Sequence, residues 1–83
     1  MIAWILMVEH WEEYDQCFSQ YNINVFVNEE DCIRFVNEHS PIEFSAYDGD
    51  KPSFVVDIIG VNTGDLCNPS AELEAAVDAA NER

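Results

Sequence analysis

The stretch Ile2-Ala3-Trp4-Ile5-Leu6-Met7-Val8 decides the fold class of this chain, because all of its residues are apolar. Alternate side chains of a strand point to opposite faces of a sheet, so the stretch predicts a strand over residues 2–9 that is apolar on both faces. Such a strand is expected to be central in its sheet, with packing on each side. The apolar run has no basic flank before it and no small-residue cleavage site after it, as a secretory signal would, and it is too short for a membrane span.

Beyond that strand, the sequence predicts a loop, a second strand and a helix. Residues 10–20 follow no clean period and are expected to form an ordered loop. Residues 21–27 alternate between apolar side chains and asparagine, which predicts a strand. Asn28 offers an N-cap before three acidic residues, so a helix should begin there and end before Pro41. The inward face of this helix is expected to carry Cys32, Phe35, Val36 and His39.

The second half of the chain predicts a hairpin and a last helix. Residues 42–47 alternate as a third strand, residues 48–52 form a turn, and residues 53–61 form a fourth strand. A loop rich in Gly and Asn follows over residues 62–69. Ser70 then caps a helix. Its apolar residues at helical spacing are Leu73, Ala76, Val77 and Ala80.

Together these elements predict a single acidic α+β domain over residues 1–83. Its order is β-β-α-β-β-α, with a mainly antiparallel four-stranded sheet and two helices. An apolar content of 48% over 83 residues is enough for a hydrophobic core and excludes an acidic disordered tail.

The charge is the strongest functional signal. Seventeen acidic residues stand against three basic ones, Arg34, Lys51 and Arg83, for a formal net charge of -14. This self-repulsion destabilises a small compact domain, so we expect the negative field to have a use. A field of this sign attracts basic protein surfaces and repels nucleic acid and anionic membranes. Direct nucleic-acid binding and membrane binding are therefore not expected.

Ten residues are candidates for contact with a partner. They are Trp11, Glu12, Glu13, Tyr14, Asp15, Glu29, Glu30, Asp31, Asp48 and Asp50. Carboxylates one helical turn apart lie about 5–6 Å from each other, and duplex DNA carries one phosphate per ~1.7 Å of axis. Rows of carboxylates, including a further group of Glu72, Glu74 and Asp78, could therefore replace a short stretch of phosphates. The alternatives are an ordinary solvated surface and adaptation to high salt.

Aromatic residues lie among the first group of acids. Trp11, Tyr14 and Phe18 are spaced by three and four, so a helical conformation would place them in one stripe. Large rings anchor protein interfaces, and an acidic rim suits an arginine-rich partner. The alternative is that the rings pack on the protein's own sheet.

Catalytic and metal-binding patterns are weak. His10 and Cys17 are the only nucleophile–base pair close in sequence, and no third group orients them. The His and Cys spacings fit no zinc site, and Asp48-Gly49-Asp50 lacks the other ligands of a calcium loop. We expect no metal, no cofactor and no enzymatic activity. The odd set Cys17, Cys32 and Cys67 argues against a secreted disulfide framework and favours a reducing cytoplasm.

In size, charge, α+β pattern and scattered acids, the chain resembles the small acidic inhibitor proteins that phages make against host enzymes. The segments Trp4-Ile5-Leu6, Val8-Glu9 and Tyr14-Asp15-Gln16 are also similar to small phage proteins that begin with a strand and a Y-D-Q loop. The class includes anti-restriction and anti-CRISPR proteins, many of which mimic DNA. The resemblance implies stoichiometric inhibition of a nucleic-acid-binding groove in the host cytoplasm, without catalysis or cofactor.

Two functions from different classes follow from the sequence. The first is an inhibitor of a host nucleic-acid-binding protein or nuclease, which acts by DNA mimicry through its surface carboxylates. The second is a protein-interaction module, or a homodimeric adaptor, that binds through its aromatic loop and uses its acidity for solubility alone. The partner expected for the first function is the basic groove of the host protein. The chain itself is expected to be a monomer or a homodimer.

Overall fold

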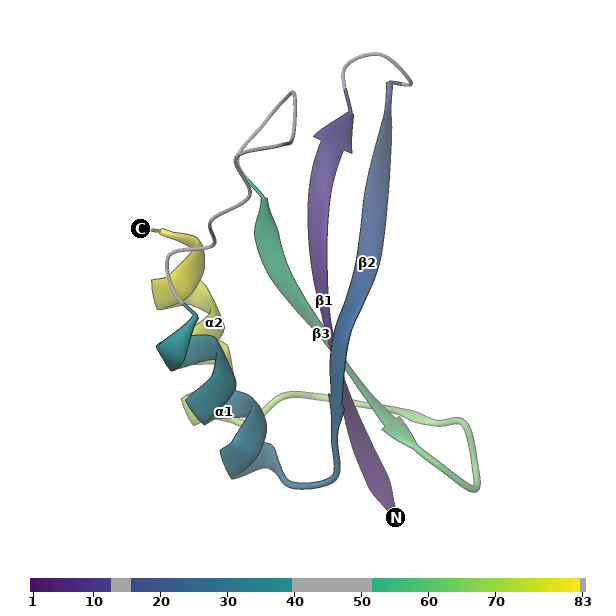
Figure 1. Ribbon diagram of the computed structural model, residues 1–83. Coiled ribbons are helices and arrows are strands. Elements are labelled where there is room, and N and C mark those ends of the chain that lie inside the picture. The colour runs from purple at the N-terminus through teal and green to yellow at the C-terminus, as the bar shows by residue number, and fades with distance from the viewer. Residues whose placement is uncertain (13–15, 40–51, 83) are drawn as a thin grey trace.

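The computed structural model describes residues 1–12, 16–39 and 52–82. Along the chain the elements are β1 (Ile2–Glu12), β2 (Cys17–Phe26), α1 (Glu29–Glu38), β3 (Ser53–Gly60), β4 (Leu66–Cys67) and α2 (Ala71–Asn81) (Figure 1). The strands form one sheet in the order β2-β1-β3-β4, and each neighbouring pair is antiparallel. The predicted α+β class with a mainly antiparallel sheet and two helices is therefore confirmed. The described elements also follow the order β-β-α-β-β-α, but their fourth strand, β4, lies in a predicted loop.

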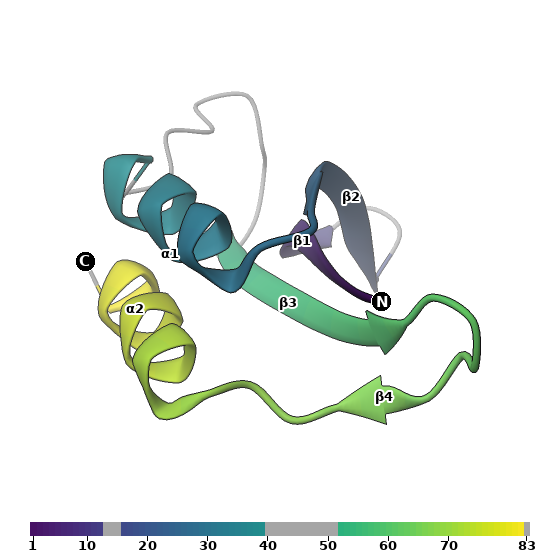
Figure 2. The same ribbon diagram turned by 90° about the horizontal axis from the view of Figure 1, so that it is seen from below.

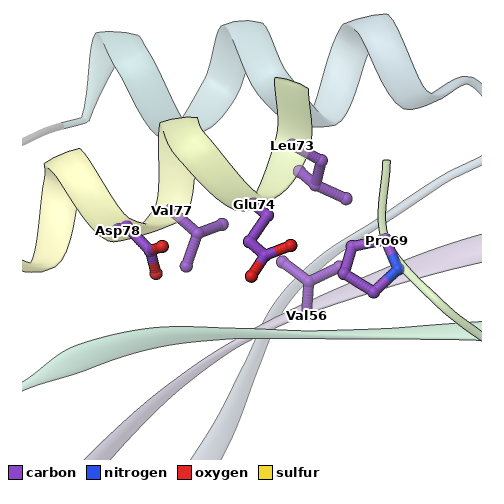
Figure 3. Close-up of a pocket in the computed structure, with 6 residues that line it drawn as sticks. All are labelled: Val56, Pro69, Leu73, Glu74, Val77 and Asp78. Carbon is purple, nitrogen blue, oxygen red and sulfur yellow. The ribbon is translucent and has the colours of Figure 1, made fainter. Parts of the chain in front are cut away.

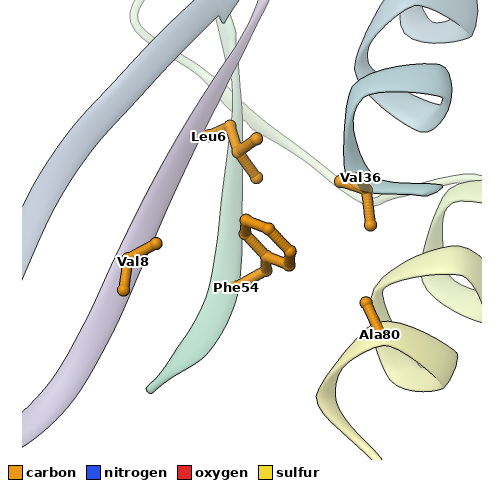
Figure 4. Packing of buried hydrophobic residues seen from close by; sticks show 5 residues of the cluster. All are labelled: Leu6, Val8, Val36, Phe54 and Ala80. Carbon is orange, nitrogen blue, oxygen red and sulfur yellow. The ribbon is translucent and has the colours of Figure 1, made fainter. Parts of the chain in front are cut away.

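β1 is a central strand, as its apolar sequence predicts, but both described helices cover the same face of the sheet (Figure 2). On that face, side chains from both inner strands and both helices form a buried cluster. Its members are Leu6, Val8, Phe54, Val36 and Ala80 (Figure 4). A second cluster of Cys32, Ile58 and Leu73 continues it. Each large apolar side chain buried here contributes roughly 1.5–3 kcal/mol, which fixes the helices on the sheet.

The other face of the sheet carries a smaller apolar surface. Met7 is buried at 7% exposure, Ile5 is half-buried, and Val25 on the neighbouring strand is 56% exposed. Asp57 lies opposite Ile5 in the register and is exposed on this same face. Among the described residues no helix covers this face. The expectation of packing on each side of the strand is therefore met only on the face that carries the helix layer.

The expected loop over residues 10–20 is wrong, because β1 extends to Glu12 and β2 begins at Cys17. The two strands pair up to Glu12 and Cys17 and so form one long hairpin. Gln16, just before β2, has φ of 51°, the left-handed conformation that hairpin turns require. The run lacked a clean period because His10, a polar residue, occupies a buried position at 3% exposure.

Part of the outer edge of β3 is covered by β4. β4 lies within the predicted loop 62–69 and pairs with Ile58 and Ile59. Continuing that register by two residues would place Pro69 opposite Val56, and a proline has no N–H to donate. The ladder therefore ends after two residues.

The helices run side by side in the same direction, and their N-termini meet (Figures 1 and 2). Ser70 caps α2 as predicted, since its Oγ accepts a hydrogen bond from the N–H of Leu73 at 3.2 Å. Asn28 stands at the N-cap position of α1, but its side chain donates to Asp31 at 3.4 Å and caps no backbone group. His39 is exposed and stacks on Phe35, so it does not belong to the inward face.

The predicted strand over residues 42–47, its turn and the hairpin with residues 53–61 lie partly or wholly outside the described residues. The predicted strand 53–61 itself is confirmed as β3, and the predicted strand 21–27 is part of β2. Within the described ranges, none of the helices is both long and apolar enough to cross a membrane.

Candidate partner-binding surface

Most carboxylates of the described chain lie on the helix layer. We call them the acidic helix surface, which consists of Glu29, Glu30, Asp31, Glu38, Glu72, Glu74, Asp78 and Glu82. Six of these side chains are exposed, and Glu29 and Asp31 are half-buried. Elsewhere in the described ranges, Glu9 and Asp57 lie on the open sheet face, Asp65 precedes β4, and Glu12 ends β1. The anionic charge of these ranges is therefore concentrated on one side of the molecule.

The junction of the two helices fixes the geometry of this surface. Ser70 Oγ donates a hydrogen bond to Glu29 Oε1, so the N-cap of α2 is joined to the first residue of α1. Helix N-termini carry a partial positive charge, which favours acidic side chains in their first turns. Each helix has such residues, and packed helices lie about 8–10 Å apart. The surface therefore holds a cluster of carboxylates at the start of α1 beside the carboxylates of α2.

Positive charge on this surface is scarce. Arg34 lies 3.5 Å from Asp31 across one helical turn, and its side chain is 66% exposed. It is the one Lys or Arg within the described ranges. An exposed pair of this kind contributes only about 0–1 kcal/mol and neutralises one of the eight carboxylates. The field of the other seven extends into solvent.

A small hollow of about 100 Å³ lies between α2 and the edge of β3 (Figure 3). Its apolar walls come from Val56, Pro69, Leu73 and Val77, and the carboxylates of Glu74 and Asp78 lie beside them. Lysine and arginine bury an apolar stem while the charged head stays in water. The hollow thus has the chemistry to receive one cationic side chain of a partner.

The structure separates the predicted contact residues into two groups. Glu29, Glu30 and Asp31 lie together at the start of α1. Trp11 and Glu12 lie at the far end of β1, about 23 Å along the strand from Trp4, which pairs with the last residue of β2 before α1. Figure 1 shows these two places at opposite ends of the molecule. The remaining predicted contacts, Glu13, Tyr14, Asp15, Asp48 and Asp50, lie outside the described residues.

The predicted aromatic stripe needs a helix, and this segment is a hairpin. Trp11 is half-buried and lies opposite Phe18 in the register of β1 and β2. The two residues are therefore cross-strand neighbours in the register of the hairpin. Aromatic residues on both sides of the polar run Glu-Glu-Tyr-Asp-Gln are the sequence signal that indicates this hairpin.

Sequence reasoning named the acids of the last helix but did not place them in the contact set. Glu72, Glu74 and Asp78 become neighbours of the first helix only through its packing against α2. Glu38 and Glu82 complete the surface and carry no local signal of their own. Knowledge that the helices are parallel would have been needed to join the two groups.

The residues considered for catalysis do not form a joint site. His10 is buried and stacks on Tyr21, with ring centroids 5.8 Å apart. Cys17 is exposed and pairs with Glu12 at the end of the hairpin. Within the described ranges, no group of three or more His, Cys, Asp or Glu residues could hold a metal ion.

Comparison with known proteins identified no relative. No family model matches the chain, and no curated protein or solved structure is significantly similar to it.

Proposed function

We propose that this protein is a stoichiometric inhibitor that occupies the basic groove of a nucleic-acid-binding protein with its acidic helix surface. The observation that carries the proposal is the concentration of eight carboxylates on two parallel helices with Arg34 as their one described basic neighbour. A surface that intersperses both signs of charge is enough for solubility, whereas a large field of one sign suits the steering of a charged partner. The role needs no catalysis and no cofactor.

The spacing of the carboxylates supports mimicry of a nucleic acid. On α2, Glu74, Asp78 and Glu82 follow one another at intervals of one turn, about 5–6 Å apart, and packed helix axes are about 8–10 Å apart. Phosphate rows of B-DNA border grooves about 6 Å and about 12 Å wide. A groove built for rows of phosphates could therefore accept the carboxylates of α2, with the acids at the start of α1 beside them. Glu74 and Asp78, beside the apolar hollow, would hold a lysine or arginine side chain of the partner.

The class of target follows from the resemblance to small acidic phage proteins. Nucleases and other nucleic-acid-binding proteins of host defence, including restriction and CRISPR effectors, present basic grooves of this kind. Such a target would be met in the host cytoplasm, where Cys17, Cys32 and Cys67 stay reduced, and all three are free thiols in the structure.

Competition with DNA tests the proposal. The immobilised protein is incubated with a bacterial lysate, and bound protein is eluted with duplex DNA. DNA should displace the captured protein, whose affinity should then fall as the salt concentration rises. Capture that duplex DNA cannot displace would contradict mimicry.

Matched variants locate the contact. The triple change Glu72→Gln, Glu74→Gln and Asp78→Asn removes three charges from the acidic helix surface. The change Glu9→Gln, Asp57→Asn and Asp65→Asn removes three charges elsewhere and serves as the control. The first should weaken binding at least about tenfold more than the second. Equal losses would show that net charge alone matters, and a larger loss with Trp11→Ala would favour an interface at the hairpin end.

A further inference from the structure

β2 is a long edge strand without any charge. The run from Gln16 to Asn28 has thirteen residues and no Asp, Glu, Lys or Arg, in a chain where 24% of residues are charged. It is the longest uncharged run in the sequence. β2 is the terminal strand of the sheet, and in the described ranges no strand pairs with its outer edge. Natural edge strands usually carry charges or proline, or are short, which prevents pairing with another chain.

The pairing pattern shows which backbone groups face outward. The Phe54 N–H donates to the Asn81 side chain and the Phe54 C=O accepts from it, so both groups point away from β1. The pair that Phe54 forms with Val8 of β1 is therefore a non-hydrogen-bonded pair. The N–H and C=O groups of Val8 must then form their hydrogen bonds toward β2, where Val8 is paired with Tyr21. By alternation, the N–H and C=O groups of residues 18, 20 and 22 point away from the sheet.

The regular part of this edge is the segment Cys17–Asn22. The register slips between Leu6 and Met7, so Ile23 is an extra residue that forms a bulge in β2. Beyond the bulge, the N–H of Val25 is covered by Asn24 Oδ1 at 2.9 Å. These two features disturb the C-terminal half of the edge and leave the N-terminal half available for pairing.

We propose that the open edge of β2 at Cys17–Asn22 pairs antiparallel with the same segment of a second copy, which makes one continuous sheet across a two-fold axis. In a symmetric antiparallel pair centred on Gln20, that residue lies opposite itself and residue 18 lies opposite residue 22. All three outward positions then form hydrogen-bonded pairs. Any charged side chain near the axis would face its own copy, and like charges directly opposite are destabilising.

The absence of charge is what selects a second copy over a foreign strand. An edge made to receive a cationic partner would be expected to use some of the seventeen acidic residues, and this edge has none. Self-pairing requires a neutral strand, which is what the sequence supplies. The inference does not depend on the proposed function, although a dimer would present two acidic helix surfaces.

Glu9, the described carboxylate in register with the axis, stays apart from its copy in this arrangement. Glu9 lies opposite Gln20 on β1 and accepts a hydrogen bond from its side chain at 3.3 Å. Glu9 of one copy is then three strand spacings from Glu9 of the other, about 14 Å. This exceeds the Debye length of about 8 Å at physiological salt. The hairpin end that carries Cys17–Asn22 also extends past the helix layer (Figure 1).

Sedimentation equilibrium of the full chain tests the pairing. The wild-type protein should form a dimer whose dissociation constant falls as salt rises, because salt screens the repulsion between two chains of charge -14. Gln20→Pro removes an outward N–H without touching the bonds to β1, so it should weaken dimerisation at least about tenfold at unchanged thermal stability. Ser19→Pro, whose N–H faces β1, should instead lower the stability of the fold.

A second pair of variants separates charge at the axis from total charge. Gln20→Lys places like charges opposite each other, while Ala79→Lys adds the same charge at an exposed position on α2. Only the first should dissociate the dimer, and circular dichroism should show both variants folded. A wild-type protein that stays monomeric at high concentration and high salt would overturn the inference. So would a dimer that survives both Gln20 changes.

Discussion

The side chain of Asn81 in α2 forms two hydrogen bonds with the backbone of Phe54 in β3. Asn81 Oδ1 accepts from the Phe54 N–H at 2.8 Å, and Asn81 Nδ2 donates to the Phe54 carbonyl oxygen at 3.1 Å. One amide thus replaces the strand that is missing at this part of the β3 edge. Because Phe54 belongs to the buried cluster, the contact ties the last turn of α2 to the core.

Asn81→Ala should therefore destabilise the protein by about 1–3 kcal/mol, since two partly buried backbone groups lose their partner. Alanine is a better helix former than asparagine, so helix propensity would act in the opposite direction. The measurement is urea unfolding followed by circular dichroism. Asn37→Ala makes the same change at an exposed position of α1 and should cost nothing. Equal stability of the two variants would show that the Asn81 contact is not formed.

Ser70 should be worth more than an ordinary helix cap, because its hydroxyl also reaches Glu29. Loss of an N-cap costs about 0.5–2 kcal/mol, and we expect Ser70→Ala to lie in the upper half of that range. A double-mutant cycle with Glu29→Gln measures the coupling between the two side chains. Ser70→Asp keeps a capping oxygen but places a second carboxylate against Glu29. Its stability should fall below that of Ser70→Asn, and the reverse order would argue against the contact.

Sequence patterns identified most elements because their signals are local. β1 follows from its apolar run, and α2 follows from Ser70 and the spacing of Leu73, Val77 and Ala80. The extension of the hairpin was missed because His10 is polar yet buried, a property that depends on packing and not on the local pattern. β4 has no sequence signature at all, since a two-residue strand exists only through its pairing with β3.

Only about half of the acidic helix surface could be predicted from the sequence, because the other half also depends on packing. The acids at the start of α1 are adjacent in the chain and were identified. The acids of α2 are 41 residues away at the Ser70–Glu29 contact, and no periodicity reports that two helices pack in parallel. Tertiary topology, which joins the two groups, is not encoded in any one segment.

Cys32 should be unreactive while Cys17 and Cys67 are exposed and react readily. Burial, and to a lesser degree the negative charge of Glu29, raises the pKa of the Cys32 thiol from 9.0 to about 11. The thiolate is the nucleophile, so little reactive form exists near neutral pH. A thiol reagent should modify two cysteines in the native protein and the third only after unfolding. Rapid modification of all three would show that the helix layer opens readily.

The same thiol predicts a loss of stability at alkaline pH. Above about pH 9 the unfolded chain releases the Cys32 proton while the folded protein retains it until about pH 11. The folded state then binds more protons, so the free energy of unfolding falls with rising pH, by up to about 1.4 kcal/mol per pH unit from this group. Below about pH 9 the thiol keeps its proton in both states, so its contribution to the free energy of unfolding is fully present. Cys32→Ala should flatten this part of the profile, whereas Cys67→Ala at an exposed site should leave it unchanged.

Glu74 and Asp78 should lower stability while they strengthen partner binding. They lie four residues apart on α2, and like charges at this spacing destabilise a helix by about 0.2–0.5 kcal/mol. Neutralising both as Glu74→Gln and Asp78→Asn should therefore raise the thermal unfolding temperature, and more so at low salt, where screening is weakest. The control, Asp57→Asn with Asp65→Asn, removes the same charge away from the helices and should raise it less. If removal of these two charges neither stabilises the protein nor weakens capture of a DNA-displaceable partner, the role proposed for the acidic helix surface is contradicted.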